Sequence, residues 1–175
     1  MKEATRAEVR VLTAGGTIDK RYDAATGILR VGRPAILEAF RKASVERATE
    51  PLPALTKDSR DITEGERLLF ANVVAAAQSD AVLVTHGTDT IAETAELIDS
   101  LDCGKTVVLT GAMVPSSFPD SDADFNLGFA YAAAQLLPPG VYVAMHGKVV
   151  HHSKYRKDRA AGRFVEVRDH PDAGS

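Results

Sequence analysis

The sequence has little that would suit a disulfide-stabilised, membrane-spanning or nucleic-acid-binding protein. It contains one cysteine, Cys103, which excludes an intrachain disulfide. A lone cysteine usually packs as a small hydrophobic residue, so a catalytic role for Cys103 is disfavoured. No apolar run approaches the roughly 20 residues that a transmembrane helix needs. The formal net charge of −3 gives no general attraction to nucleic acid or anionic membranes, so we expect neither as a partner.

The N-terminal segment also lacks the apolar stretch of a secretory signal. Residues 1–8 (MKEATRAE) are polar and mixed in charge, and we expect a cytoplasmic location. The 175 residues are 45% hydrophobic and 26% charged, which is ordinary for a globular domain with a full core. We expect one domain over residues 1–175, with residues 169–175 as a flexible tail.

Short apolar segments alternate with helix-like segments along the chain. This alternation predicts an α/β fold in which helices cover both faces of a doubly wound, mostly parallel sheet. Thr63 and Glu66 have the spacing of a capping box at a helix start. The prolines at 51 and 53 are expected to end a strand. The expected strands are 9–12, 45–52, 81–84, 106–109 and 141–145, with edge pieces at 149–150 and 164–167; the expected helices begin at 35, 63, 90 and 126, and the last three extend to about 78, 101 and 137.

Two threonine-bearing loops follow predicted strands. They are Thr13–Asp19 (TAGGTID) and Thr85–Thr90 (THGTDT). Ligands of parallel α/β sheets bind at the carboxyl ends of the strands. A threonine hydroxyl becomes a nucleophile when a neighbouring group takes its proton, so this pair indicates a nucleophilic site.

Each of these loops also has a simpler interpretation. The glycines before Thr17 could serve only a tight turn, and the loop does not match the phosphate-binding glycine patterns. Thr88 and Asp89 could cap the helix that follows. His86 is expected to pack behind its loop rather than to act as a base.

The basic segment at residues 151–157 (HHSKYRK) is expected to be a solvated face, with a nucleic-acid patch as a weak second interpretation. Its two histidines lack partners at a recognisable metal-ligand spacing, so no metal site is expected. Two further loops, at residues 57–63 and 110–117, read as ordinary turns when taken alone.

The order of these motifs carries more information than any one of them. TAGGTID is followed by DSRDIT (58–63), THGTDT, LTGAM (109–113) and a lysine after the next strand, Lys154. This series resembles the bacterial-type L-asparaginase family over nearly the whole chain. The resemblance implies an asparaginase N-terminal-type fold and hydrolysis of the side-chain amide of L-asparagine to L-aspartate and ammonia, with no metal or organic cofactor.

The same resemblance assigns catalytic roles. Thr17 matches the usual nucleophile of the family, although which threonine attacks first is disputed there. Thr88, Lys154 and Asp89 match a relay in which the lysine removes a proton and the aspartate orients it. Tyr22 matches a mobile-loop tyrosine near the nucleophile.

Substrate-binding roles follow in the same way. Ser59 matches a serine that holds the α-carboxylate of the substrate. Asp89 is expected to hold the α-amino group, because a buried ammonium needs a carboxylate partner. The carbonyl of Ala112 is expected to contact the substrate amide. The full expected binding set is Gly16, Asp58, Ser59, Gly87, Thr88, Asp89 and Ala112.

The sequence departs from the family pattern at Arg60 and Val114, where relatives commonly carry other residues. The chain also ends where longer members begin a second domain, so we expect a short form with a more open site. On that basis we expect a homo-oligomer, a dimer or tetramer, whose contact covers part of the strand-end face, with the mobile loop or the segment 154–159 reaching the neighbour.

Two other functions remain open. One is an amidase of different preference, either a glutaminase or the ammonia-supplying subunit of a tRNA amidotransferase. The other is a non-catalytic module that binds an amino acid. The presence of Thr17, Thr88, Asp89 and Lys154 together disfavours the binding module, because holding a ligand does not need two activated hydroxyls and a lysine.

Overall fold

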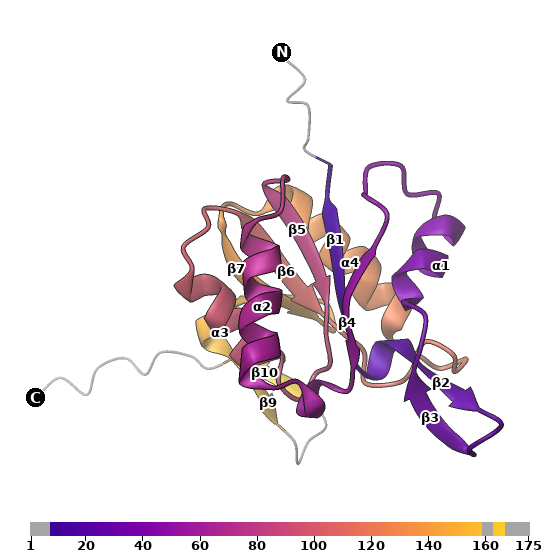
Figure 1. The fold of residues 1–175 in the computed structure, drawn as a ribbon. Coiled ribbons are helices and arrows are strands. Elements are labelled where there is room, and N and C mark those ends of the chain that lie inside the picture. The colour runs from indigo at the N-terminus through magenta and orange to yellow at the C-terminus, as the bar shows by residue number, and fades with distance from the viewer. Residues whose placement is uncertain (1–7, 159–162, 167–175) are drawn as a thin grey trace, which may run out of the picture.

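A computed structural model describes residues 8–158 and 163–166, and these form one α/β domain around a six-stranded sheet (Figure 1). The strand order is β4-β1-β5-β6-β7-β8. The first five strands are parallel, and β8 joins the edge antiparallel to β7. The predicted doubly wound, mostly parallel sheet is confirmed. The strands are β1 (Arg10–Gly15), β4 (Leu52–Lys57), β5 (Ala81–Thr85), β6 (Thr106–Thr110), β7 (Gly140–Met145) and β8 (Lys148–His151).

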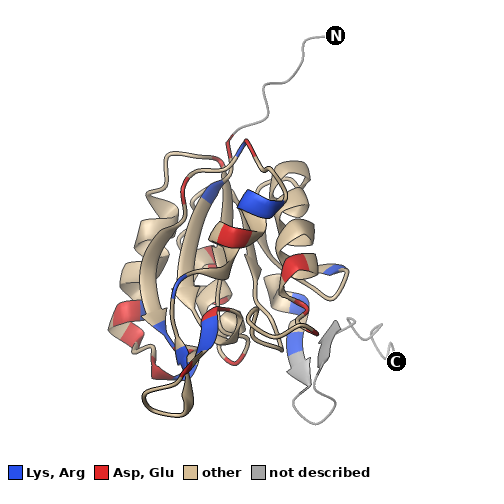
Figure 2. Ribbon diagram, turned by 90° about the vertical axis from the view of Figure 1, so that its right-hand side faces the viewer, with Lys and Arg blue, Asp and Glu red and all other residues tan. Residues whose placement is uncertain are grey.

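Helices cover both faces of the sheet, as Figure 2 shows from the side. The core residues assign two helices to each face. Alternate residues of each buried strand point to opposite faces. Val84 packs with α2 and α3, whereas Leu83 packs with α1 and α4. None of the described helices is both long and apolar enough to cross a membrane. The helices are α1 (Ala35–Lys42), α2 (Glu64–Ala75), α3 (Ile91–Ser100) and α4 (Ala123–Leu136).

Two small sheets and three short 3-10 turns lie outside the main sheet and its helices. The hairpin of β2 (Lys20–Asp23) and β3 (Ile28–Val31) projects from the body in Figure 1. A second two-stranded sheet pairs β9 (Tyr155–Asp158) with β10 (Arg163–Glu166). Short 3-10 turns follow three strands: η1 (Thr17–Asp19), η2 (Ser59–Asp61) and η3 (His152–Lys154). The expected tail at 169–175 lies outside the described residues.

One predicted helix cap is confirmed, and other predictions about helix ends need correction. Thr63 and Glu66 form the predicted capping box of α2. Thr88 and Asp89 do not cap α3, because the N-cap is Thr90 and its hydroxyl donates instead to the Ser59 carbonyl, 2.9 Å away. The helix predicted from residue 126 begins at Ala123, and α2 ends at Ala75 rather than near residue 78.

The strand predicted at 45–52 was wrong. Only an isolated bridge joins Ala48 to Val9, and β4 begins at Leu52, beyond Pro51. The sheet accepts Pro53 because β4 is an edge strand, where a missing N–H does not break a ladder on both sides. The C-terminal edge piece was also partly wrong, since β10 pairs with β9 and not with the main sheet.

Candidate active site

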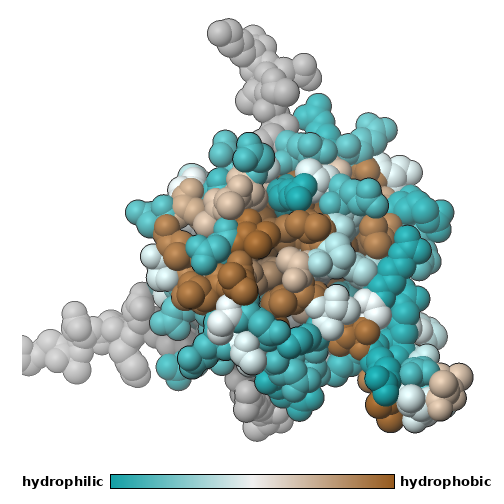
Figure 3. Space-filling view, viewed as in Figure 1, coloured by the Kyte–Doolittle hydropathy of each residue, from teal (hydrophilic) through white to brown (hydrophobic). Residues whose placement is uncertain are grey.

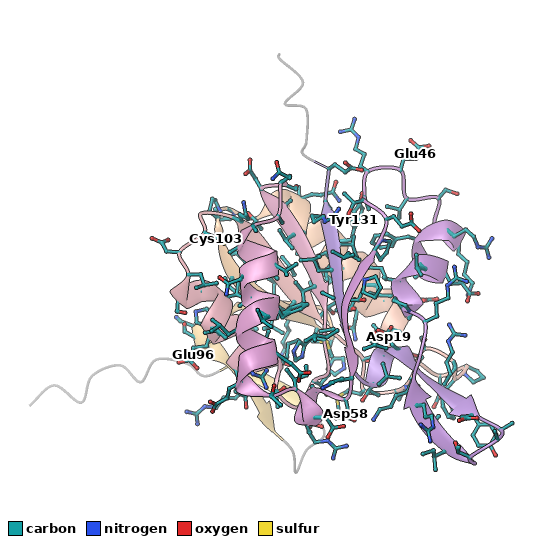
Figure 4. The ribbon with its side chains drawn as sticks, in the orientation of Figure 1. Asp19, Glu46, Asp58, Glu96, Cys103 and Tyr131 are labelled. Atoms are coloured by element: carbon teal, nitrogen blue, oxygen red, sulfur yellow. The ribbon has the colours of Figure 1, made fainter. Side chains whose placement is uncertain are left out.

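The loops singled out by sequence meet at the carboxyl ends of four adjacent strands. They follow β4, β1, β5 and β6, which are neighbours in that order in the sheet. In Figure 4 this is the lower end of the molecule, where Asp19 and Asp58 are labelled. Cys103 lies at the opposite end, in the loop between α3 and β6, and packs against the core as expected for a small hydrophobic residue.

Three of these loops touch through glycine. Gly16 has a φ of +90°, and a Cβ atom added there would overlap the backbone of Gly87. A Cβ atom on Gly87 would lie only 2.5 Å from the Cβ and Oγ of Ser59. Gly16 also donates a backbone hydrogen bond to the Lys57 carbonyl, 2.9 Å away. The glycines are therefore required for close backbone approach, and this contact brings together the segments that carry Thr17, Ser59 and Thr88.

The loop after β6 closes the same group from the other side. A Cβ atom on Gly111 would lie 2.5 Å from the His86 carbonyl oxygen and 3.1 Å from Cγ2 of Thr88. Thr88, Ser59 and Ala112 are all buried, whereas Thr17 at the start of η1 is partly exposed. Three of these residues are thus shielded from solvent, and solvent reaches Thr17 in part.

A group of charged side chains extends over the loops after β4 and β5. Lys20 Nζ lies 2.6 Å from Asp58 Oδ2, and Arg60 Nε lies 3.0 Å from Asp58 Oδ1. The hydrogen bonds from Arg60, together with Lys20, hold the pKa of Asp58 well below its usual range despite partial burial. Arg60 Nε is also 3.7 Å from Oδ2 of Asp89. The Arg60 guanidinium thus bridges two carboxylates that were expected to bind substrate.

His86 is fixed as a neutral, structural residue. Burial lowers the pKa of His86 to about 4, although its hydrogen bond to Gly87 opposes the shift. Its Nδ1 lies 2.8 Å from the Gly87 carbonyl, which only an N–H can satisfy, so Nε2 accepts from the Thr94 hydroxyl at 2.9 Å. Both ring nitrogens are engaged, which agrees with the predicted packing role behind the loop.

A carboxylate that sequence reasoning did not single out holds the loop after β6. Oδ1 of Asp122 accepts backbone hydrogen bonds from Met113 and Val114 at 3.0 and 3.1 Å. Burial alone would raise the pKa of Asp122, but these bonds and the His146 ring outweigh it and lower the pKa. Asn126 donates to the Gly111 carbonyl at 3.0 Å. Asp122 is the N-cap of α4, which was predicted to begin only at residue 126, so no sequence signal indicated this role.

A second unpredicted carboxyl is Asp19, two residues after Thr17. It is 1% exposed, and burial raises its pKa to about 7 although the Ala35 N–H donates to Oδ1 at 2.7 Å. This hydrogen bond ties the end of η1 to the start of α1. Asp19 therefore anchors the segment that carries Thr17.

Two predicted catalytic residues lie on less enclosed elements. Tyr22 is on β2 of the projecting hairpin and is 67% exposed. Lys154 is partly buried at the end of η3, a turn that packs against α3 and β7. From there β9 lies toward the same lower end of the molecule in Figure 1. Their assignments to catalysis stay predictions.

Comparisons with known proteins identify the family to which the chain is similar. The family described as "Asparaginase, N-terminal" matches residues 8–165. A glutamyl-tRNA(Gln) amidotransferase subunit of Aeropyrum pernix is 36% identical over 150 residues, which are 80% of this chain and 35% of that protein. L-asparaginase of Thermococcus kodakarensis is 32% identical over 163 residues, which are 87% of this chain and 48% of that protein.

A solved structure of an L-asparaginase has a similar fold. The structure of the thermostable L-asparaginase from Thermococcus kodakarensis superposes with a TM-score of 0.78 at 29% identity, covering 90% of this chain and 50% of that one. The chain thus spans half or less of the length of these relatives.

Proposed function

The chain belongs to the asparaginase family, and on that premise we propose that it hydrolyses the side-chain amide of L-asparagine to L-aspartate and ammonia. The observation that carries the proposal is the contact of Gly16 with Gly87 and of Gly87 with Ser59. This contact draws together two threonine-bearing loops and a serine-bearing loop at one end of the sheet. Convergence of hydroxyl-bearing loops from separate strands is the arrangement that nucleophilic acyl transfer needs.

The proposed reaction has two steps. A threonine Oγ, of Thr17 or Thr88, attacks the side-chain carbonyl carbon while its proton passes toward Lys154. The C–N bond then breaks, and ammonia leaves with that proton. Water next attacks the threonine ester, which releases aspartate and restores the hydroxyl. In this scheme Asp89 orients the lysine and Tyr22 covers the nucleophile once the β2–β3 hairpin closes.

We assign substrate binding to groups on the same loops. Ser59 and the backbone of Gly16 and Gly87 would bind the α-carboxylate, and Asp89 the α-ammonium. Asp58, held ionised by Arg60 and Lys20, would maintain the shape of the β4 loop. No metal or organic cofactor takes part in this scheme.

Ammonia release from L-asparagine by the purified chain tests the proposal. We expect turnover of L-asparagine that exceeds turnover of L-glutamine, because a pocket shaped for the shorter side chain rejects an added methylene by about 1–3 kcal/mol. Absence of ammonia release with either amide, from protein shown to bind L-asparagine, would favour the non-catalytic binding module.

A second candidate is an ammonia-supplying role in tRNA-dependent amidation, because the relative with 36% identity is named as a glutamyl-tRNA(Gln) amidotransferase component. The net charge of −3 gives no general attraction to tRNA. Comparable kcat/KM values for the two amides would favour a glutaminase-type activity over the asparaginase.

We also propose that the protein is a homo-oligomer. Exposed apolar side chains gather on α2, where Leu68, Leu69 and Val73 are 40–68% exposed. Figure 3 shows an apolar area on this face. The contact first expected at the strand-end face is therefore proposed to extend over α2. The segment 154–159 lies partly outside the described residues, and the cytoplasmic location stays a prediction.

A further inference from the structure

Three potential metal ligands meet outside the strand-end loops. They are Asp99 in the last turn of α3, His151 at the end of β8 and His152 at the start of η3. One donor atom from each lies within 4.8 Å of the other two. We propose that these side chains bind a divalent transition metal of the Zn²⁺ type.

The fold brings the three residues together in a way that sequence spacing does not reveal. His151 lies opposite Tyr142 in the β7–β8 ladder, and the Tyr142 ring meets the His151 ring edge-on at 5.8 Å. The chain then turns into η3, which packs on α3. This turn places His152 Nε2 at 3.0 Å from Oδ2 of Asp99. Two imidazoles on adjacent residues thus face a carboxylate from another element.

Two imidazoles and one carboxylate suit Zn²⁺ and its neighbours in the first transition row. Ligand atoms of a tetrahedral zinc ion lie roughly 3.4 Å apart, given metal–ligand distances of about 2.0–2.2 Å. The observed spacing therefore needs only a small rotation of the side chains. The Asp99 side chain is 43% exposed and has room to make that rotation, whereas the His152 side chain is only 11% exposed and is held in place.

Contacts with Ser153 orient one of the rings. His151 Nδ1 lies 2.9 Å from the Ser153 hydroxyl and accepts a hydrogen bond from the Ser153 backbone N–H at 3.5 Å. These contacts hold the His151 ring in place beside His152. Since His151 is exposed, an ion can reach the site from solvent. A water molecule would complete the coordination.

An ion at this site would clamp η3 to α3. His152 and Lys154 belong to the same three-residue turn. The bound metal would therefore restrain the segment from which Lys154 extends. The site itself does not depend on the proposed amidase activity.

Isothermal titration of the untagged chain with ZnCl₂ in a non-chelating buffer tests the proposal. We expect one ion per chain with a micromolar or tighter Kd, and a rise in Tm of roughly 5–10 °C at a hundredfold excess of free Zn²⁺ over Kd. Replacing the exposed ligand, His151→Ala, should weaken binding by roughly tenfold or more, and Asp99→Asn should do the same.

The matched controls are His146→Ala and Cys103→Ser. His146 pairs with Asp122 and Cys103 lies between α3 and β6, so neither belongs to the proposed set. Both variants should retain the full affinity. The proposal is overturned if the wild-type chain binds no Zn²⁺, if His151→Ala and Asp99→Asn bind it as tightly as wild type, or if a control variant loses it equally. Far-UV circular dichroism verifies that each variant is folded.

Discussion

Arg60 places a positive charge where the proposed substrate ammonium would bind. Its guanidinium contacts Asp58 and approaches Asp89, the proposed partner of that ammonium. A cation at this position competes with the ammonium for the same carboxylate. Because Arg60 is well exposed, solvent screens the competition and keeps it modest.

Arg60→Gln should therefore lower KM for L-asparagine by roughly two- to fivefold and leave kcat nearly unchanged. The control is Arg30→Gln, since Arg30 pairs with Asp23 on the projecting hairpin. Steady-state kinetics at low salt give KM and kcat for the two variants and for wild type. A rise in KM would instead mean that Arg60 holds the α-carboxylate.

Asp19 makes stability depend on pH in an unusual direction. Its folded pKa is about 7 because of burial, against an ordinary value of 3.8. Between these values the folded state retains a proton that the unfolded state has released, so the free energy of unfolding falls as pH rises. This decrease in the free energy of unfolding is absent below about pH 3.8 and complete above about pH 7.

Asp19→Asn removes this titration while keeping an acceptor for the Ala35 N–H. Its stability relative to wild type should improve by up to about 4 kcal/mol between about pH 4 and about pH 8. Thermal unfolding of both proteins across that range is the measurement. A difference in Tm that stays constant with pH would contradict the buried, protonated carboxyl.

Among the elements, the loops after β1, β4 and β5 must approach one another closely for the proposed site to form. Gly87→Ala would push its methyl group into Ser59, 2.5 Å away, and separate the loops. We expect turnover to fall by roughly 100-fold, since displacements of about 1 Å have such effects. Gly65→Ala is the matched control, because a Cβ atom there meets nothing within 4 Å in α2.

Gly65→Ala should keep wild-type activity and raise stability by up to about 1 kcal/mol, as expected for alanine in a helix. Chemical denaturation and ammonia release on both variants separate folding from function. If Gly87→Ala remained fully active, the close packing of the loops would not matter for catalysis.

The strands and helices differ in how well the sequence predicts them. Apolar periodicity and the capping pair at Thr63 and Glu66 were sufficient for most strands of the sheet, the start of α2 and the positions of the threonine loops, because these are local signals. The strand expected at 45–52 was wrong because Pro53 is tolerated on an edge strand, and the sequence does not show that β4 lies at the edge. The contacts of Asp122 and of Asp99 with His152 could not be predicted, since only tertiary packing brings distant residues together.

For the whole molecule, the exposed leucines of α2 indicate a surface that favours association. Leu69→Lys replaces a side chain that is 68% exposed and should shift a dimer or tetramer toward monomer. Leu136→Lys, at a similarly exposed position on α4, should leave the assembly unchanged. Light scattering at micromolar concentration compares them. A wild-type chain that is already a monomer would refute the oligomer.

The proposed activity requires that two converging threonine loops form one nucleophilic site. Ammonia release from L-asparagine by Thr17→Ala and Thr88→Ala, each compared with Thr26→Ala, tests this most directly. Thr26 lies in the β2–β3 turn, where its hydroxyl donates to Asp23. We expect both site variants to lose roughly 100-fold or more in turnover while Thr26→Ala matches wild type. Wild-type turnover by either Thr17→Ala or Thr88→Ala would show that the altered threonine is only a loop residue.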